Sequence, residues 1–149
     1  MSMSSNKIRI IAIGKMTKDY EPLYIHFTKM LQKQLQIIEI ISKYQDVNLE
    51  GQLIMQHISK DDFVITMEIL GQALSSIEFA KKLSDLLSSQ KRISFIIGGS
   101  NGIAENVKAR SDYSFSMSEF TLPHLLARII LIEQIYRASA INNNHPYHK

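Results

Sequence analysis

The chain has 149 residues, of which 45% are hydrophobic and 21% charged, a balance typical of one globular domain rather than of a disordered or collagen-like chain. It contains no cysteine, which excludes disulfides, thiol nucleophiles, iron–sulfur clusters and cysteine-ligated zinc sites. The formal net charge of +3 permits an acidic partner such as RNA without requiring one.

The first six residues are polar and lack the basic start and apolar core of a secretory signal. We therefore expect residues 1–6 to form a flexible N-terminal extension and residues 7–149 to form a single domain. The longest near-continuous apolar run, residues 125–135, is interrupted by Arg128 and Glu133 and is shorter than the roughly 20 residues of a membrane span. The expected location is cytoplasmic.

Strands and helices are predicted to alternate along the first half of the chain. Residues 7–13 are expected to form a buried strand, because their isoleucines are β-branched and suit a pleated surface. Thr17 can cap a helix over about residues 18–34, with Pro22 in the first turns, where a missing N–H costs least. A second strand is predicted over residues 37–41 and a shorter helix over residues 48–58.

The same alternation continues in the second half. A third strand is predicted over residues 63–69, and Ser75 or Ser76, supported by Glu78, can cap a helix that runs to about Ser88. Residues 93–97 are nearly all apolar, as in strands covered on both faces of a parallel sheet. The remaining predicted elements are a glycine turn at 98–102, a short helix, a strand over 113–116 and a helix from Pro123 to about Ala140. Together they predict an α/β fold with a mostly parallel sheet flanked by helices.

The last predicted helix carries apolar residues around most of its circumference. A surface helix shows one apolar stripe, so a helix apolar on several sides must be covered on several sides. In a domain this small, a second copy of the chain is a natural cover. The pattern therefore predicts a homodimer. Its members are Leu125, Leu126, Ile129, Ile130, Leu131, Ile132 and Ile135.

Three segments are predicted to meet where ligands bind in open α/β sheets, at the carboxyl ends of the strands. They are residues 67–71, 98–102 and 116–124. The glycine turn allows a close backbone approach to a ligand, although a plain tight turn explains the same glycines. It lacks the Gly-Lys-Ser/Thr ending of a P-loop. A dinucleotide site using Glu119 on the ribose stays open as an alternative, despite unfavourable glycine spacing.

Other polar residues give weaker signals. His145 and His148 could chelate a metal, but no third ligand lies nearby in the sequence, so no metal site is predicted. Glu133 and Arg137 are spaced as a surface ion pair, and His124 and Arg128 are expected to be solvated neighbours. No serine–histidine–acid arrangement is visible around the three candidate serines. Those serines are Ser100, Ser116 and Ser118.

Three stretches of the chain resemble one known family. The C-terminal stretch combines Thr-Leu-Pro-His at 121–124, Arg128, Glu-Gln-Ile-Tyr-Arg-Ala at 133–138 and Asn-His-Pro-Tyr-His-Lys at 144–149. The glycine motif at 95–102 and the opening residues 7–15 match the same family. From residue 7 to its end the chain is similar to the ribosomal RNA large-subunit methyltransferase H family, of the SPOUT class.

The resemblance implies transfer of a methyl group from S-adenosylmethionine to N3 of a pseudouridine in large-subunit (23S) ribosomal RNA. It further implies a homodimer that acts on assembled ribosomes and a C-terminal trefoil knot that holds the cofactor. Met67 stands where the family usually has leucine, and Glu68 replaces the commoner aspartate. The cofactor-binding residues implied by position are Met67, Gly98, Met117, Ser118, Glu119, Phe120, Thr121 and Leu122.

For catalysis we hypothesise that His148, with Tyr147, takes the proton from N3, and that Arg137 stabilises the developing anion. A tail that only clamps the RNA backbone is an equal possibility. For the whole protein, an NAD- or nucleotide-binding enzyme and a non-catalytic ribosome-associated module also stay open. Candidate phosphate contacts are Lys15, Lys18, Lys108, Arg110, Arg128, Arg137 and Lys149.

Overall fold

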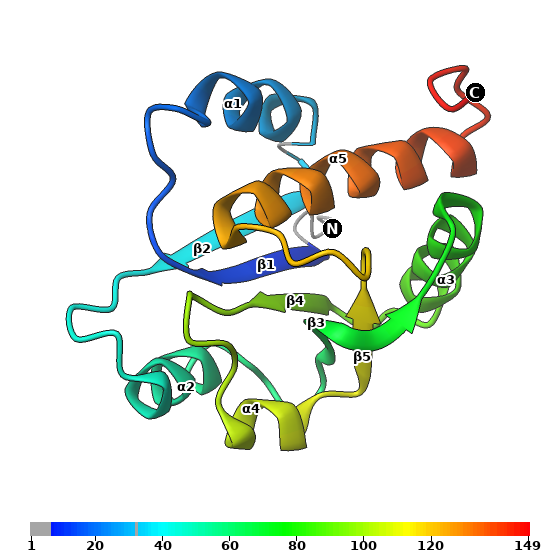
Figure 1. Cartoon of the computed structure of the whole chain (residues 1–149). Helices are drawn as coiled ribbons and strands as arrows, with labels where there is room; N and C mark the ends of the chain where they lie inside the picture. Colours follow the sequence, from blue (N-terminus) through cyan, green and yellow to red (C-terminus); the bar gives the residue numbers. More distant parts are fainter. Residues whose placement is uncertain (1–6, 32) are drawn as a thin grey trace.

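The computed structural model describes residues 7–31 and 33–149, and in that part of the chain five parallel strands form one sheet (Figure 1). Their spatial order is β2-β1-β4-β3-β5, and every neighbouring pair is parallel. The predicted parallel sheet is confirmed, whereas the extension predicted over residues 1–6 lies outside the described residues. The strands are β1 (Ile8–Ile13), β2 (Leu35–Ile40), β3 (Phe63–Ala73), β4 (Ile93–Ile97) and β5 (Tyr113–Ser116).

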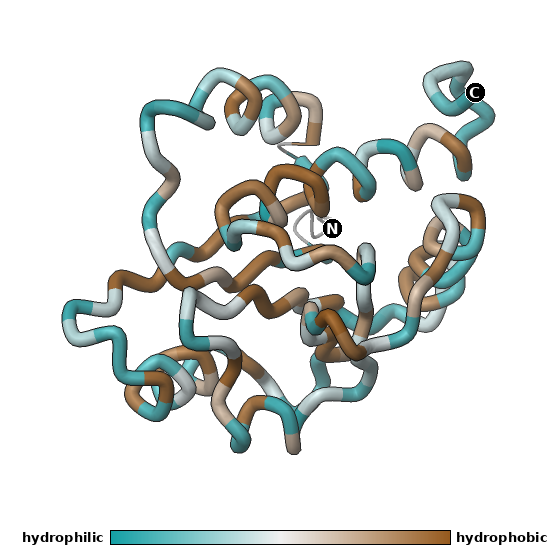
Figure 2. Tube along the Cα trace, in the orientation of Figure 1, coloured by the Kyte–Doolittle hydropathy of each residue, from teal (hydrophilic) through white to brown (hydrophobic). Residues whose placement is uncertain are grey.

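Helices cover both faces of the sheet. One face carries α1 (Glu21–Met30), α3 (Ser76–Ser88) and α5 (His124–Asn142), and the other carries α2 (Val47–Met55) and α4 (Glu105–Arg110) (Figure 1). Side chains of β1 alternate between two buried clusters: Ile10 packs toward α3 and α5, and Ile11 packs toward α2 and α4. Figure 2 shows hydrophobic residues along the central strands and the first half of α5. This two-sided burial explains why the strands are almost wholly apolar.

Some predicted boundaries are confirmed and others are wrong. Helix α3 begins after Ser75 with the predicted capping box, in which Ser75 and Glu78 satisfy each other's backbone N–H. Thr17 caps no helix: α1 begins at Glu21 after Tyr20, and no side chain caps it. Pro22 explains the later start, since its missing N–H and fixed φ suit the first helical turn. The ends of α1 and α2 also come earlier than predicted, at Met30 and Met55.

Strand β3 is longer than predicted because it contains a bulge. Met67 and Gln72 both pair with Phe115 of β5, so residues 68–71 loop out between them. A Cβ on Gly71 would lie 2.7 Å from the backbone carbonyl carbon of Ser114, so a glycine is needed where the looped segment returns to the sheet. The bulge leaves a four-residue segment at the carboxyl edge of the sheet.

Helix α5 lies over the sheet between α1 and α3. All of its residues from 124 to 141 are buried or half-buried within the single chain. This packing accounts for much of the apolar circumference from which a homodimer was predicted. The homodimer therefore stays a prediction that needs other support.

Arg128 of α5 overturns a prediction. It was expected to be a solvated neighbour of His124 and a phosphate contact, but its side chain is fully buried. Its Nη1 lies 2.6 Å from Glu39 Oε2, and its Nη2 donates to the carbonyl oxygens of Ile13 and Gly14 at 3.3 and 2.9 Å. The guanidinium thus ties the start of α5 to the carboxyl ends of β1 and β2.

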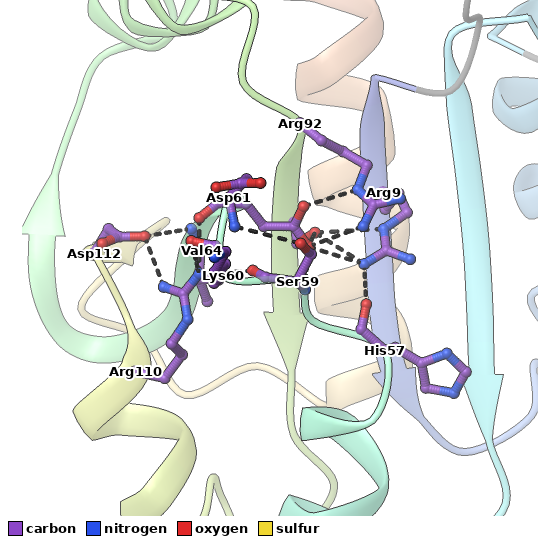
Figure 3. Close-up of polar contacts among 11 residues, drawn as sticks. Arg9, His57, Ser59, Lys60, Asp61, Val64, Arg92, Arg110 and Asp112 are labelled. Atoms are coloured by element: carbon purple, nitrogen blue, oxygen red, sulfur yellow. Dashed lines mark hydrogen bonds and ion pairs between the residues drawn. The ribbon is translucent and has the colours of Figure 1, made fainter.

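A second buried ion cluster joins the amino ends of the strands around Asp62 (Figure 3). The carboxylate lies 2.9 Å from Arg92 Nε and 3.3 Å from Arg9 Nη2, and it accepts the Ser59 backbone N–H at 2.9 Å. Arg9 also donates to the His57 carbonyl. Burial alone would raise the pKa of Asp62, but these hydrogen bonds and the two guanidinium charges lower it below its ordinary value.

Replacing Asp62 by asparagine should destabilise the fold by about 3–5 kcal/mol, because it leaves a buried guanidinium without its counter-charge. In the wild type, the stabilisation from Asp62 is fully present above an ordinary pKa of about 3.9 and is lost as pH falls through the lower folded value. Urea unfolding as a function of pH measures both effects. The exposed Asp85, paired only with Lys81, supplies the control Asp85→Asn, expected to change stability by less than about 1 kcal/mol. Equal losses in the two variants would contradict the role of Asp62.

Candidate functional site

A cavity of about 710 Å³ opens at the carboxyl edge of the sheet. Its walls come from the β3 bulge, from the turn after β4 and from the loop between β5 and α5. The three segments predicted to converge do therefore line one space, although Glu119 is not part of its wall. The wall includes Met67, Glu68, Leu70, Gly98, Gly99, Ser116, Met117, Ser118, Phe120, Thr121, Leu122 and His124.

The inner part of the cavity is mostly apolar. Met67 and Met117 line the cavity and pack against the buried core cluster that contains Phe115. Leu70 and Phe120 stand on the rim, 98% and 78% exposed. The polar and charged residues of the wall are Glu68, Ser100, Lys108, Ser116, Ser118, Thr121 and His124. An apolar slot edged by backbone N–H and C=O groups suits a flat heteroaromatic ring that also needs hydrogen bonds.

Two positions of the turn, Gly98 and Gly102, require glycine for different reasons. A Cβ on Gly98 would lie 2.4 Å from the carbonyl oxygen of Gly102, and Gly102 itself has a φ of +82°. The Gly102 N–H donates to the Gly99 carbonyl at 3.1 Å. These contacts make the turn tight whether or not a ligand binds, which agrees with its interpretation as a plain tight turn. The turn also places backbone without side chains at the cavity wall.

The loop before α5 is held by its own serines. Ser116 Oγ donates to the Ser118 carbonyl, and the Phe120 N–H donates to Ser118 Oγ, both at 2.9 Å. These contacts fix the backbone of the loop without a regular element. Glu119 is not part of the cavity wall, although its neighbours Ser118 and Phe120 are. The dinucleotide hypothesis therefore loses the acidic residue that was expected to bind the ribose.

The three predicted catalytic residues meet one another, but not the cavity. Glu133 joins them: its Oε2 lies 2.7 Å from Arg137 Nη2 and 2.7 Å from Tyr147 Oη. Arg137 Nη1 lies 3.0 Å from His148 Nδ1. His124, on the cavity wall, precedes Arg137 by 13 positions of α5, so about 20 Å separates them at ~1.5 Å per residue.

The surroundings set the charge of this cluster, which we call the tail cluster (Glu133, Arg137, Tyr147 and His148). Burial and the hydrogen bond to Glu133 raise the pKa of Tyr147, which therefore stays protonated at neutral pH. The hydrogen bond to Glu133 raises the pKa of Arg137. Sequence analysis grouped Arg137, Tyr147 and His148 by their proposed roles but interpreted Glu133 only as a surface ion-pair partner of Arg137, because nothing local indicates that Tyr147 also reaches Glu133.

His124 belongs to the segment 116–124 that was predicted to reach this edge of the sheet, whereas Glu50, which lies behind the cavity wall, was not singled out from the sequence. His124 lines the cavity, and burial and the nearby Arg128 charge lower its pKa, opposed only in part by Glu50. The imidazole is therefore neutral at pH 7. Its Nε2 lies 3.5 Å from where a Cβ of Gly14 would stand. Glu50 is buried on α2.

Most of the proposed phosphate contacts are already engaged. Arg128 is buried, and Lys108 lies 3.5 Å from Glu68. Arg110 donates to the carbonyls of residues 59 and 62 and pairs with Asp112. Arg137 belongs to the tail cluster. Lys108 is exposed despite its ion pair with Glu68, and the remaining three, Lys15, Lys18 and Lys149, are exposed as well.

Two searches of the described residues were negative. Within residues 7–31 and 33–149, no three histidine or acidic side chains gather as metal ligands. In the same described ranges, no helix combines the length and apolar content that a bilayer span requires.

Comparison with known proteins gives a consistent result. A family model described as "Predicted SPOUT methyltransferase" matches residues 6–148. The chain is 42% identical to the ribosomal RNA large subunit methyltransferase H of Clostridioides difficile, covering 95% of this chain and 99% of the relative. It is 41% identical to the protein of that name from Acholeplasma laidlawii, covering 96% and 99%.

Among solved structures, the fold is similar to that of a probable methylase family protein from Haemophilus influenzae Rd KW20. The TM-score is 0.55 at 15% identity, over 93% of this chain and 67% of the other. At this identity the similarity concerns the fold alone. It agrees with the parallel sheet and flanking helices of this chain.

Proposed function

Because the chain belongs to the SPOUT methyltransferase family, we propose that it methylates N3 of a pseudouridine in large-subunit (23S) ribosomal RNA, with S-adenosylmethionine as donor. The names of its relatives support ribosomal RNA as substrate. The observation that carries the proposal is the cavity that three loops build at the carboxyl edge of the sheet. Family membership also implies the C-terminal trefoil knot.

The cavity fits the proposed donor. Its volume of about 710 Å³ lies within the usual range of small-molecule sites. Met67 and the wall residues of the loop would hold the adenine in the apolar slot, and Gly98 would let backbone groups approach it. Those loop residues are Met117, Ser118, Phe120, Thr121 and Leu122. S-adenosylmethionine supplies a methyl group activated by its cationic sulfur. The protein's main task is then to align the acceptor nitrogen, since positioning lowers the barrier by several kcal/mol.

We further propose that the working site is shared between two copies of the chain. The tail cluster lies about 20 Å along α5 from the cavity of its own chain, too far for His148 to reach a base bound there. Exposed apolar side chains on the cavity rim, Leu70 and Phe120, are suited to burial against a second copy. A symmetric dimer would supply the tail of one subunit to the cavity of the other.

The tail cluster limits how His148 can act. A guanidinium only donates, so while Arg137 faces Nδ1 of His148, the neutral imidazole carries its proton on Nε2. His148 can take the N3 proton on Nδ1 once Arg137 turns toward the developing anion on the base. If Arg137 stays in place, the Nε2–H can instead clamp RNA. The two roles predict different kinetics for a His148 variant.

Two other functions are weaker. A nicotinamide-dependent enzyme would need an acid at the ribose, and Glu119 is not on the cavity wall. A non-catalytic ribosome-associated module would bind ribosomes without consuming the donor. Neither explains why the cavity loops and the tail both match the methyltransferase family.

The first test transfers labelled methyl from S-adenosylmethionine to ribosomes that lack this modification. Ribosomes with uridine at the target run in parallel. We expect label in large-subunit RNA and much less in the uridine control. Uridine carries the same N3–H, so this difference would show that the protein also recognises the rest of the pseudouridine base. Donor binding without label would indicate another substrate. Neither label nor donor binding would reject the methyltransferase proposal, and binding of NAD would then be measured.

The second test separates the two roles of His148. If His148 takes the proton, His148→Ala should lower the single-turnover rate about 10²-fold or more at saturating ribosomes. If the tail only clamps RNA, the same variant should raise KM and leave that rate unchanged. His26→Ala, on the exposed helix α1, is the control, because His145 accepts a hydrogen bond from the Tyr147 N–H and is part of the tail. An unchanged rate and KM would remove His148 from the mechanism.

The third test asks whether the site is shared. Ser118→Trp blocks the cavity, and deletion of residues 145–149 removes the tail. Each variant alone should be inactive. Mixed in equal amounts and allowed to exchange subunits, they should recover about a quarter of wild-type activity, because half of the dimers carry one intact cavity–tail pair. No recovery in verified mixed dimers would mean that each chain works with its own tail.

A further inference from the structure

Glu50 is a buried carboxylate without a partner. It lies on α2 with 4% of its surface exposed. Its Oε1 is shielded from solvent and accepts no hydrogen bond from residues 7–31 or 33–149. Within the same described ranges, no lysine, arginine or histidine forms an ion pair with it. Burying a charge in this way costs several kcal/mol unless something compensates it.

This carboxylate lies directly behind the cavity wall. Gly99 lines the cavity, and a Cβ on Gly99 would lie 3.9 Å from Glu50 Oε1. Glu50 is not itself a residue of the cavity wall. Because Gly99 has no side chain, only the Gly99 backbone lies between the carboxylate and the cavity. On the cavity side, Glu50 is close enough to His124 for its charge to counteract the lowering of the histidine pKa.

Neighbouring cations do not compensate Glu50. Arg128 at this edge forms no ion pair with Glu50 among the described residues: Glu39 and two backbone carbonyls occupy its Nη1 and Nη2 atoms, and its buried Nε has no hydrogen-bond partner there. His124 is neutral at pH 7, as its lowered pKa requires. The negative charge of Glu50 is therefore in excess, at the edge of a space that admits a ligand.

We propose that Glu50 attracts the cationic amino group of the methyl donor to the Gly99 side of the cavity and compensates its charge across the Gly99 backbone. This inference rests on the proposed function, in which the donor is S-adenosylmethionine. That molecule ends in an amino acid whose ammonium group carries a positive charge and three N–H donors. A neutral N–H of the target base would supply a hydrogen bond but would leave the buried charge uncompensated. The charge of Glu50 therefore favours the ammonium.

The test combines two ligand changes with one substitution, and calorimetry measures each Kd. S-adenosylmethionine is compared with its analogue lacking the amino group and with 5′-methylthioadenosine, which lacks the whole amino acid. Glu50→Gln should weaken S-adenosylmethionine about tenfold to hundredfold. It should leave the other two ligands unchanged within about twofold, because they lack the ammonium group. Glu21→Gln, on exposed α1, should change none of the three.

If Glu50→Gln does not fold, the affinities of the wild-type protein for the same ligands still test the inference. Wild-type protein should bind the deaminated analogue about tenfold or more weakly than S-adenosylmethionine; equal affinities would overturn the inference. Equal weakening of all three ligands by Glu50→Gln, or no weakening, would also overturn it and leave the methyltransferase proposal intact. Wild-type protein that binds neither S-adenosylmethionine nor 5′-methylthioadenosine would overturn both.

Discussion

The buried guanidinium of Arg128 is the contact on which the arrangement of the site depends. Its Nη atoms bridge Glu39 on β2 and the carbonyls at the end of β1, Ile13 and Gly14. Removing one partner of such a pair would leave a charge buried alone, at a cost of about 3–5 kcal/mol. The contact therefore fixes where α5 begins. Because the loop of residues 117–123 must end there, Arg128 also sets the position of the longest cavity wall.

The other two walls depend on backbone features at the same edge. In β3, the bulge lifts residues 68–71 out of the sheet, and Gly71 allows the chain to return against Ser114. After β4, the lack of room beside Gly98 keeps the turn tight. The sheet supplies rigid strands, and these departures from regularity open a cavity between them. The site is thus built on well-ordered elements, although the residues that line it belong mostly to loops.

Local sequence signals were sufficient for much of the fold. Isoleucine-rich runs located β1 and β4, and the pair Ser75 and Glu78 located the start of α3, because each signal lies within a few residues. The burial of Arg128 was not predictable in this way, since its partner Glu39 is 89 positions away. The convergence of three loops followed from the parallel sheet. The exclusion of Glu119 from the cavity wall depends on how the loop turns, which the sequence alone does not specify.

Two buried charges at one edge of the sheet have different explanations. Arg128 is compensated inside the chain, so its role is to hold α5 in place. Glu50 is buried to a similar degree but has no counter-charge among the described residues. A fold gains nothing in stability from an uncompensated carboxylate, and such groups are concentrated at functional sites. Glu50 lies behind Gly99, beside a cavity large enough for a ligand. A cationic ligand bound there would supply the counter-charge that Glu50 lacks among the described residues, which explains why an energetically costly buried carboxylate stands at this position.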